Sequence, residues 1–421
     1  MTYDFSTIGA LIGMVIAIVL IIKKFHPAYS LIIGALIGGI IGSAGNLSLT
    51  VDTMMSGAGS MITSVLRIMT SGILAGALIK TGSAEKIAQV IVDKLGSRRA
   101  LIAVSLATMV ICAVGVFVDI SVITVAPIAL AIGKKAGYNK QSLLLAMIGG
   151  GKAGNIISPN PNTIAVSESF EVDLTSLMMR NAVPALCALV VTILLASLLS
   201  KKNGIAVADS DLEQSESKEL PGIGAAVLGP VVVIALLMLR AIAGIAVDPM
   251  IALPVGGLVC TLATGNWKKF GEFAEFGLGK VTGVSILLLG TGTIAGIIKA
   301  SALQADVVNV LNMFRLPAFL LAPIAGILMA GATASTTAGA TVASQTFASV
   351  LLGEGVPALA AGAMIHAGAT VIDSLPHGSF FHATGGAVYL SIPERMKLIV
   401  FEALVGLTST LAATILFLII G

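Results

Sequence analysis

The sequence predicts an all-α, polytopic membrane protein built from two inverted-topology repeats, and three observations lead to this prediction. First, the 421 residues are 57% hydrophobic and only 11% charged, whereas soluble proteins are about 25% charged. Second, stretches such as 5–22 and 182–199 contain no charged residue, and each is close to the length that a helix needs to cross a bilayer. Third, short motifs of the first half recur in the second half.

The recurring motifs keep a nearly fixed distance along the chain. Gly57-Ala58-Gly59 matches Gly277-Leu278-Gly279 at 220 residues, and Pro159 matches Pro376 at 217 residues. Because the matches keep the same order, we expect two homologous halves. The predicted organisation is a first repeat over 1–200, a cytoplasmic linker over 201–222 and a second repeat over 223–421.

The positive charges predict that the two halves point in opposite directions. The loop after Gly45-Asn46 has no Lys or Arg before Ser56, whereas its counterpart continues as Gly265-Asn266-Trp267-Lys268-Lys269. Basic loops collect on the cytoplasmic side of a membrane, so equivalent loops are expected on opposite sides. Inverted repeats of this kind occur in many secondary transporters. Both chain ends are then expected outside the cell.

Each half is expected to contain about five crossings and one re-entrant hairpin. The predicted crossings are 5–22, 28–44, 57–80, 141–166 and 175–199, then 223–243, 249–264, 276–299, 358–383 and 397–420. The predicted hairpins cover 100–133 and 317–350. The amphipathic stretch 84–95 is expected to lie on the inner membrane surface as a connecting helix.

Four predicted interruptions of these helices mark the expected binding site. They are the hairpin turns near 117–121 and 333–337 and the broken spans 155–163 and 373–379. Irregular backbone at membrane depth occurs only where it is buried in protein or lines a water-filled cavity. The interruptions are therefore expected to surround a site.

The segment around Asn160 suggests what this site binds. Pro159 and Pro161 remove two backbone donors, so no continuous helix can form there. The helix that resumes near Thr163 offers an N-terminus, which attracts a carboxylate. The candidate substrate-binding residues are Ser121, Thr124, Ser158, Asn160, Asn162, Thr163, Ser335, Thr336, Thr337, His377 and Ser379.

Ionisable residues in apolar segments are costly and usually functional. Asp119, Asp373 and His366 are the candidate proton-coupling residues. Lys152 is expected to pair with Asp119 or with a substrate carboxylate, or to form a structural ion pair. No metal site is predicted, because the His and Asp residues lack a recognised ligand spacing. No cofactor is expected, and a proton gradient or Na⁺ would drive transport.

The segment 118–127, followed by the break at 158–163, resembles the gluconate permease family of the ion transporter superfamily. The resemblance implies proton-coupled uptake of gluconate or a related organic acid across the bacterial cytoplasmic (inner) membrane. It also implies an elevator mechanism and a homodimer. Where the family has a histidine between prolines, this chain has Asn160, so glycerate, 3-hydroxybutyrate and D-serine stay open as substrates.

The alternative function is a cation/proton antiporter, which also uses broken helices and a buried Asp. A channel is disfavoured, because hairpins that enter from opposite sides would close a continuous pore. An enzyme is disfavoured, because no catalytic motif has the required spacing. The formal charge of +3 does not suggest nucleic acid. The expected partners are a small carboxylate substrate, the lipid bilayer and a second copy of the chain.

Overall fold

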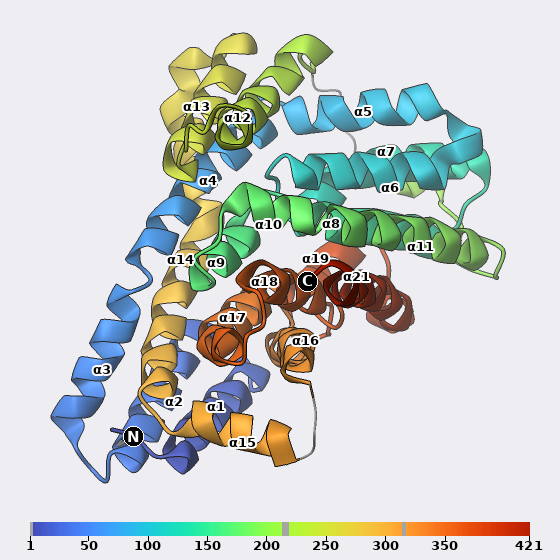
Figure 1. The fold of residues 1–421 in the computed structure, drawn as a ribbon. Helices are drawn as coiled ribbons and strands as arrows, with labels where there is room; N and C mark the ends of the chain where they lie inside the picture. The colour runs from blue at the N-terminus through green and yellow to red at the C-terminus, as the bar shows by residue number, and fades with distance from the viewer. Residues whose placement is uncertain (1–2, 213–218, 314–316) are drawn as a thin grey trace.

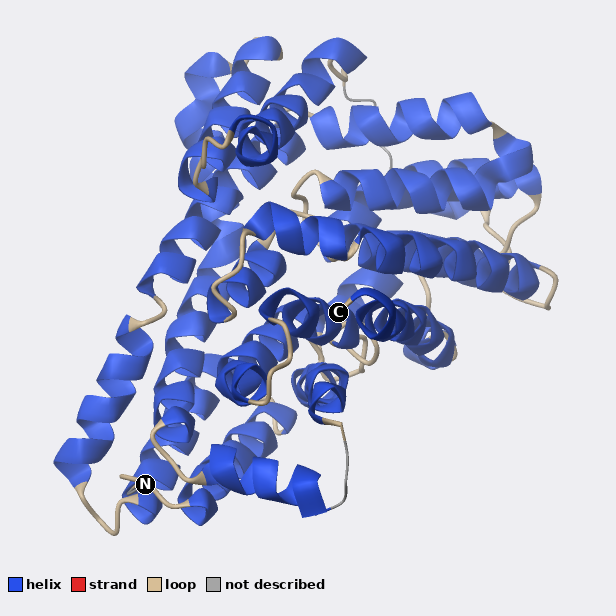
Figure 2. Cartoon of the chain, in the orientation of Figure 1, coloured by secondary structure: helices blue, strands red, loops and turns tan. Residues whose placement is uncertain are grey.

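In the computed structural model, the chain is helical through the residues that the structure describes, which are 3–212, 219–313 and 317–421 (Figures 1 and 2). Within these ranges no strand forms, and only the isolated bridges Phe5–Ser301 and Asn139–Ala206 are present. The all-α prediction is therefore confirmed for the described part of the chain.

The helices of the two halves follow one another in the same order if α3 and α4 together are set against the single long helix α14. The first half contains α1 (Thr7–Ile22), α2 (Pro27–Gly42), α3 (Leu47–Gly59), α4 (Ile62–Lys80), α5 (Ser83–Leu95), α6 (Ala100–Ala113), α7 (Val118–Ala136), α8 (Lys140–Asn155), α9 (Pro161–Ser169), α10 (Leu174–Arg180) and α11 (Ala182–Ser200). The second half contains α12 (Ile223–Ala243), α13 (Pro249–Ala263), α14 (Phe270–Lys299), α15 (Leu303–Met313), α16 (Leu321–Thr333), α17 (Thr336–Gly353), α18 (Ala358–Gly368), α19 (Ser379–Ala387), α20 (Ile392–Met396) and α21 (Ile399–Ile420). The inverted orientation of the halves stays a prediction.

Among the described residues, five helices are long and apolar enough to cross a membrane, or six if the bent pair Ser83–Leu95 and Ser97–Ala113 is counted as one span. The five are Leu47–Lys80, Ala182–Ser200, Ile223–Arg240, Trp267–Lys299 and Ile392–Ile420. The chain is thus a multi-pass membrane protein. The other predicted crossings consist of shorter or broken helices.

Two predicted crossings start too late in the sequence. The crossing predicted at 57–80 belongs to the longer span Leu47–Lys80, and the one predicted at 276–299 belongs to Trp267–Lys299. The charged residues Glu272 and Glu275, which precede the predicted start at residue 276, lie inside helix α14. Long helices tolerate such residues where the side chains are exposed at the end of a span.

Helices α3 and α4 follow each other end to end along one edge of the molecule, and the long helix α14 runs beside both (Figure 1). Glycines allow the backbones to touch: a Cβ added to Gly292 of α14 would lie 2.6 Å from the carbonyl oxygen of Gly57 in α3. Burial of apolar surface does not drive helices together inside a membrane. Small residues at a crossing let the helices pack closely, and this close packing stabilises the contact. The helix pairs α1–α2 and α12–α13 pack beside these long helices.

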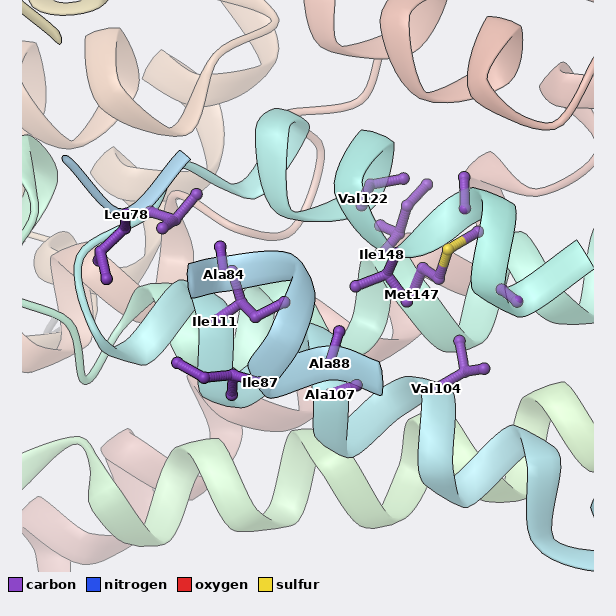
Figure 3. Close-up of a cluster of buried hydrophobic side chains, with 14 of the residues drawn as sticks. Leu78, Ala84, Ile87, Ala88, Val104, Ala107, Ile111, Val122, Met147 and Ile148 are labelled. Atoms are coloured by element: carbon purple, nitrogen blue, oxygen red, sulfur yellow. The ribbon is translucent and has the colours of Figure 1, made fainter. Parts of the chain in front are cut away.

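The amphipathic stretch 84–95 forms helix α5, as predicted, and its apolar side packs on protein. Figure 3 shows Ala84, Ile87 and Ala88 of this helix against residues of α6 such as Ala107 and Ile111. Leu78 of α4, Val122 of α7 and Met147 and Ile148 of α8 belong to the same buried cluster. This cluster joins α5 to the first hairpin, α6–α7. Its position at a membrane surface stays a prediction.

The first part of the linker predicted at 201–222 is attached to the turn between α7 and α8. The amide of Lys140 donates to the carbonyl oxygen of Ile205 at 2.8 Å, and Lys140 Nζ lies 2.8 Å from the Asp211 carboxylate. Burial raises the pKa of Asp211, but the hydrogen bonds from Lys140 and the Ala208 amide, together with the charges of Lys140 and Lys134, outweigh it, so the pKa lies below its ordinary value. Residues 213–218 of the predicted linker lie outside the described residues.

Candidate functional site

The four predicted interruptions line one cavity of about 320 Å³. Its wall includes the α6–α7 turn, the α8–α9 break, the α16–α17 turn and the α18–α19 break. One face of helix α14, from Lys280 to Leu287, completes the wall. The volume lies at the lower end of the range for small-molecule sites, about 300–1,000 Å³.

The first hairpin turn lies slightly earlier in the sequence than predicted. Helix α6 ends at Ala113 and α7 begins at Val118, so the turn covers 114–117. Asp119 belongs to the first turn of α7 and lines the cavity. Ser121 follows it in α7 and is fully buried. The carboxylate of Asp119 is therefore presented to the cavity from a helix and not from a loop.

The break between α8 and α9 occurs where the two prolines predicted it. Asn160 is the N-cap of α9, and its Oδ1 accepts hydrogen bonds from the amides of Asn162 at 2.9 Å and Thr163 at 3.1 Å. Its Nδ2 donates to the carbonyl oxygen of Asn155 at 3.0 Å. The side chain of Asn160 is thus used to fold the break, and Asn162 and Asn155 face the cavity.

The second hairpin turn is strained and closely packed. Ala334 has φ 45°, a left-handed conformation that is costly for a residue with a Cβ and is often found at functional sites. The next residue, Ser335, caps α17 by accepting from the amide of Ala338 at 3.3 Å. A Cβ added to Gly378 would lie 2.7 Å from the Cβ of Ala334. The α18–α19 break therefore packs directly on this turn.

Hydrogen bonds and an ion pair join the two halves at the cavity. Thr337 of the second half donates to Asn162 Oδ1 of the first half. Thr336 Oγ1 donates to Asp373 Oδ2 at 2.6 Å. Lys152 forms an ion pair with Asp373, its Nζ 2.7 Å from Asp373 Oδ1; of the three predicted possibilities this matches the structural ion pair and not a pairing with Asp119. The interruptions of both halves thus form one connected unit.

The structure brings some of the predicted site residues to the cavity and leaves others outside its wall. The predicted residues that line the cavity are Asp119, Asn162, Ser335, Thr336, Thr337, Asp373 and Ser379. The predicted residues that do not line it are Ser121, Thr124, Ser158, Asn160, Thr163, His366 and His377. His366 is fully buried in α18, and His377 Nε2 lies 3.3 Å from the carbonyl oxygen of Ala332. The functional role of each residue stays a prediction.

Two polar residues of the cavity wall were not among the residues predicted from the sequence. Lys280 projects from α14, and it interacts electrostatically with Asp119 and lies 5.1 Å from the centre of the Phe276 ring. Asn155 also lines the cavity, and within the described residues its buried Nδ2 has no hydrogen-bond partner. Lys280 could have been identified from the sequence, because it is a charged residue inside the apolar stretch 276–299. Asn155 was named only as the start of the broken span.

Positive helix ends and one lysine face the cavity beside the carboxylates of Asp119 and Asp373. Helices α7, α17 and α19 begin at cavity residues Val118, Thr336 and Ser379, and α9 begins one residue before Asn162. The first amides of a helix have no partner within the helix, and each N-terminus carries about half a positive charge. Lys280 adds a full positive charge. Among the described residues, no group of three or more His, Cys, Asp or Glu side chains is placed to hold a metal ion.

Apolar spans that surround a polar cavity built from interrupted helices define a membrane transporter. The sequence profile of the GntP family permeases matches residues 5–420. The chain therefore belongs to the GntP family of permeases, and the family resemblance seen in the sequence is confirmed.

Individual relatives agree with this assignment. An uncharacterized transporter of Haemophilus influenzae is 52% identical over 98% of both chains. A D-serine transporter of Escherichia coli O6:H1 is 23% identical over 78% of this chain and 79% of its own. The crystal structure of the YdaH transporter of Alcanivorax borkumensis has a TM-score of 0.63 at 14% identity and covers 98% of both chains. The last comparison shows a shared fold.

Proposed function

We propose that this permease is a secondary active transporter that imports a small organic acid anion, a sugar or hydroxy acid similar to gluconate, by proton symport. The observation that carries the proposal is the convergence of four helix N-termini and Lys280 on one cavity. Fixed partial charges attract a carboxylate without burying a full counter-charge for each substrate oxygen. The anion can therefore bind and leave.

The remaining groups of the cavity suit a hydroxylated substrate. Ser335, Thr336 and Ser379 supply hydroxyl groups, and Asn155 supplies a free amide donor. Hydroxyls both donate and accept hydrogen bonds, as the hydroxyls of a sugar acid do. D-serine, which is the substrate in the name of one relative, also carries a carboxylate and a hydroxyl group. It is therefore the nearest competing substrate.

Asp119 is the proposed proton carrier. Two carboxylates line the cavity wall, those of Asp119 and Asp373. Asp373 is paired with Lys152, whereas Asp119 forms no salt bridge with any of the described residues. A carboxyl group that faces the substrate and has no fixed partner can take up and release a proton with each transport cycle. Asp373 and His366 remain the other proposed coupling residues, and Na⁺ is the alternative coupling ion.

The proposed movement is of the elevator type, in the bacterial inner membrane and within a homodimer. Three of the four interruptions, the α8–α9 break, the α16–α17 turn and the α18–α19 break, are joined by the Asn162–Thr337 and Asp373–Thr336 contacts, which favours their movement as one body. The long helices α3, α4 and α14 form the neighbouring body. Of the α14 residues that line the cavity, Lys280 carries a charge.

The test is uptake of labelled gluconate into proteoliposomes with an imposed pH gradient. We expect uptake that requires the gradient, competition by a subset of glycerate, 3-hydroxybutyrate, citrate and D-serine, and loss of gradient-driven uptake in Asp119→Asn. Full proton-driven uptake by Asp119→Asn would refute the role of Asp119. Absence of all uptake, with proton flux evoked by added Na⁺, would replace the proposal by a cation/proton antiporter.

A further inference from the structure

A lysine ammonium group is fully enclosed behind the wall of the cavity. Lys152 of α8 is 3% exposed, and its Nζ lies 2.7 Å from Asp373 Oδ1 and 2.6 Å from the carbonyl oxygen of Thr370. A carboxylate and a backbone carbonyl are the oxygen ligands that hard metal cations prefer. The ammonium group therefore lies between two oxygen atoms that could also bind a metal cation.

The carboxylate that Lys152 contacts belongs to the substrate cavity. Asp373 lines the cavity wall and accepts further hydrogen bonds from Thr336 at 2.6 Å and from Ser374 at 3.0 Å. Lys152 comes from the first half, whereas these partners come from the hairpin turn and the break of the second half. The ammonium therefore connects three of the interruptions that form the site.

The charge of Lys152 changes the balance of the whole cavity. Two carboxylates, Asp119 and Asp373, and one ammonium, Lys280, line its wall. With both carboxylates ionised and without Lys152, this wall would carry a net negative charge, which disfavours an anion until Asp119 takes up a proton. Removal of one partner also leaves a buried charge uncompensated, which is strongly unfavourable. A cation at the position of Lys152 thus favours anion binding.

We propose that Lys152 is a built-in counter-cation, which occupies the place that an alkali cation from solution would otherwise have to fill. The protein therefore needs no Na⁺ at Asp373, and the loss of Lys152 converts this position into a Na⁺ site. The proposal rests on the proposed function in assigning an anion to the cavity. Its test does not need a transported substrate.

The test compares thermal unfolding of purified wild-type protein and Lys152→Ala in NaCl and in choline chloride at equal ionic strength. A ligand that binds only the folded state stabilises it increasingly with the logarithm of its concentration above the dissociation constant. We expect the Tm of Lys152→Ala to rise in this way with Na⁺ and to stay unchanged in choline. The wild-type Tm should not distinguish the two salts.

Two further variants serve as controls. Lys140→Ala removes another buried lysine, 5% exposed, whose Nζ lies 2.8 Å from Asp211 outside the cavity, and its Tm should not respond specifically to Na⁺. The double variant Lys152→Met with Asp373→Asn removes both charges together. It should fold and lose the Na⁺ response, because no uncompensated carboxylate remains.

Each outcome decides the proposal. A Na⁺ response that is equal in the wild type and in Lys152→Ala would overturn it, as would a folded Lys152→Ala without any response. If Lys152→Ala does not fold, a folded double variant supports charge compensation, and an unfolded double variant overturns it. Failure of organic acid uptake by the wild type would overturn the proposed function and leave the Na⁺ response as an independent result.

Discussion

Replacing Gly292 by alanine is expected to separate the two long helices at their crossing. The added Cβ would lie 2.6 Å from the carbonyl oxygen of Gly57 and 2.9 Å from the Cα of Ala58. Ordinary contacts of a Cβ begin at 3.4 Å. The helices α3 and α14 must therefore move apart by about 0.8 Å at this point, because neither obstacle is a flexible side chain.

The expected cost follows from this displacement. Overpacking of a tight interface by one methyl group typically costs about 1–3 kcal/mol, and helix–helix contacts in a membrane depend on close packing. Gly279 lies on the same helix and has no atom within 4 Å of an added Cβ. Gly279→Ala should be neutral or more stable by up to about 1 kcal/mol, because alanine favours the helix.

The assay is equilibrium or thermal unfolding of the purified protein, followed by the fluorescence of Trp267. This is the one tryptophan of the sequence, and it lies three residues before the start of α14. The free energy of unfolding of Gly292→Ala should fall below that of Gly279→Ala by about 1–3 kcal/mol. Equal stabilities would refute the reasoning from the helix crossing.

Three further predictions concern charge and topology. Lys280→Ala should weaken binding of a carboxylate substrate by about tenfold, equivalent to about 1.4 kcal/mol, measured as KM for uptake; an equal effect of Lys268→Ala, outside the cavity wall, would contradict this role. Asp211→Asn should lower the Tm at pH 7. The pKa of Asp211 is lowered in the folded state, so its contribution is full above the unfolded pKa of about 3.9 and is lost as the pH falls through the lower folded value. The Tm difference should thus begin to shrink as the pH falls below about 4, and a difference that does not shrink with falling pH would contradict the assignment. Tags at both chain ends should be accessible from outside intact cells, because the distribution of basic loops predicts both ends there; labelling of either tag only after permeabilisation would refute this topology.

The positions of the helix interruptions could be predicted because they depend on local chemistry. Pro159 and Pro161 prevent a helix wherever the chain folds, and Asn160 is a strong N-cap residue. The turn at Ala334 was likewise marked by the surrounding Ser and Thr residues. These local signals are enough to locate all four interruptions that line the cavity.

The partners of the charged residues could not be predicted, because they depend on how the halves pack. Lys152 and Asp373 are 221 residues apart, and no sequence pattern selects Asp373 over Asp119. No role was predicted for Lys280 from the sequence. Its place beside the interruptions depends on the packing of α14, which begins at Phe270 and brings Lys280 to the cavity wall.

Lys280 lies on α14 and not on the interrupted helices, so the affinity for the anion would differ between the two faces of the membrane. The contacts Thr337–Asn162 and Thr336–Asp373 belong to the interrupted helices and would travel with them. If those helices slide along α14, a bound anion leaves Lys280 behind. Its dissociation constant would then be larger on the opposite face of the membrane, and inhibition by the same anion would differ between right-side-out and inside-out vesicles. A carrier with this asymmetry is half-saturated at a lower anion concentration on one face than on the other, while the gradients across the membrane still set the direction of net transport.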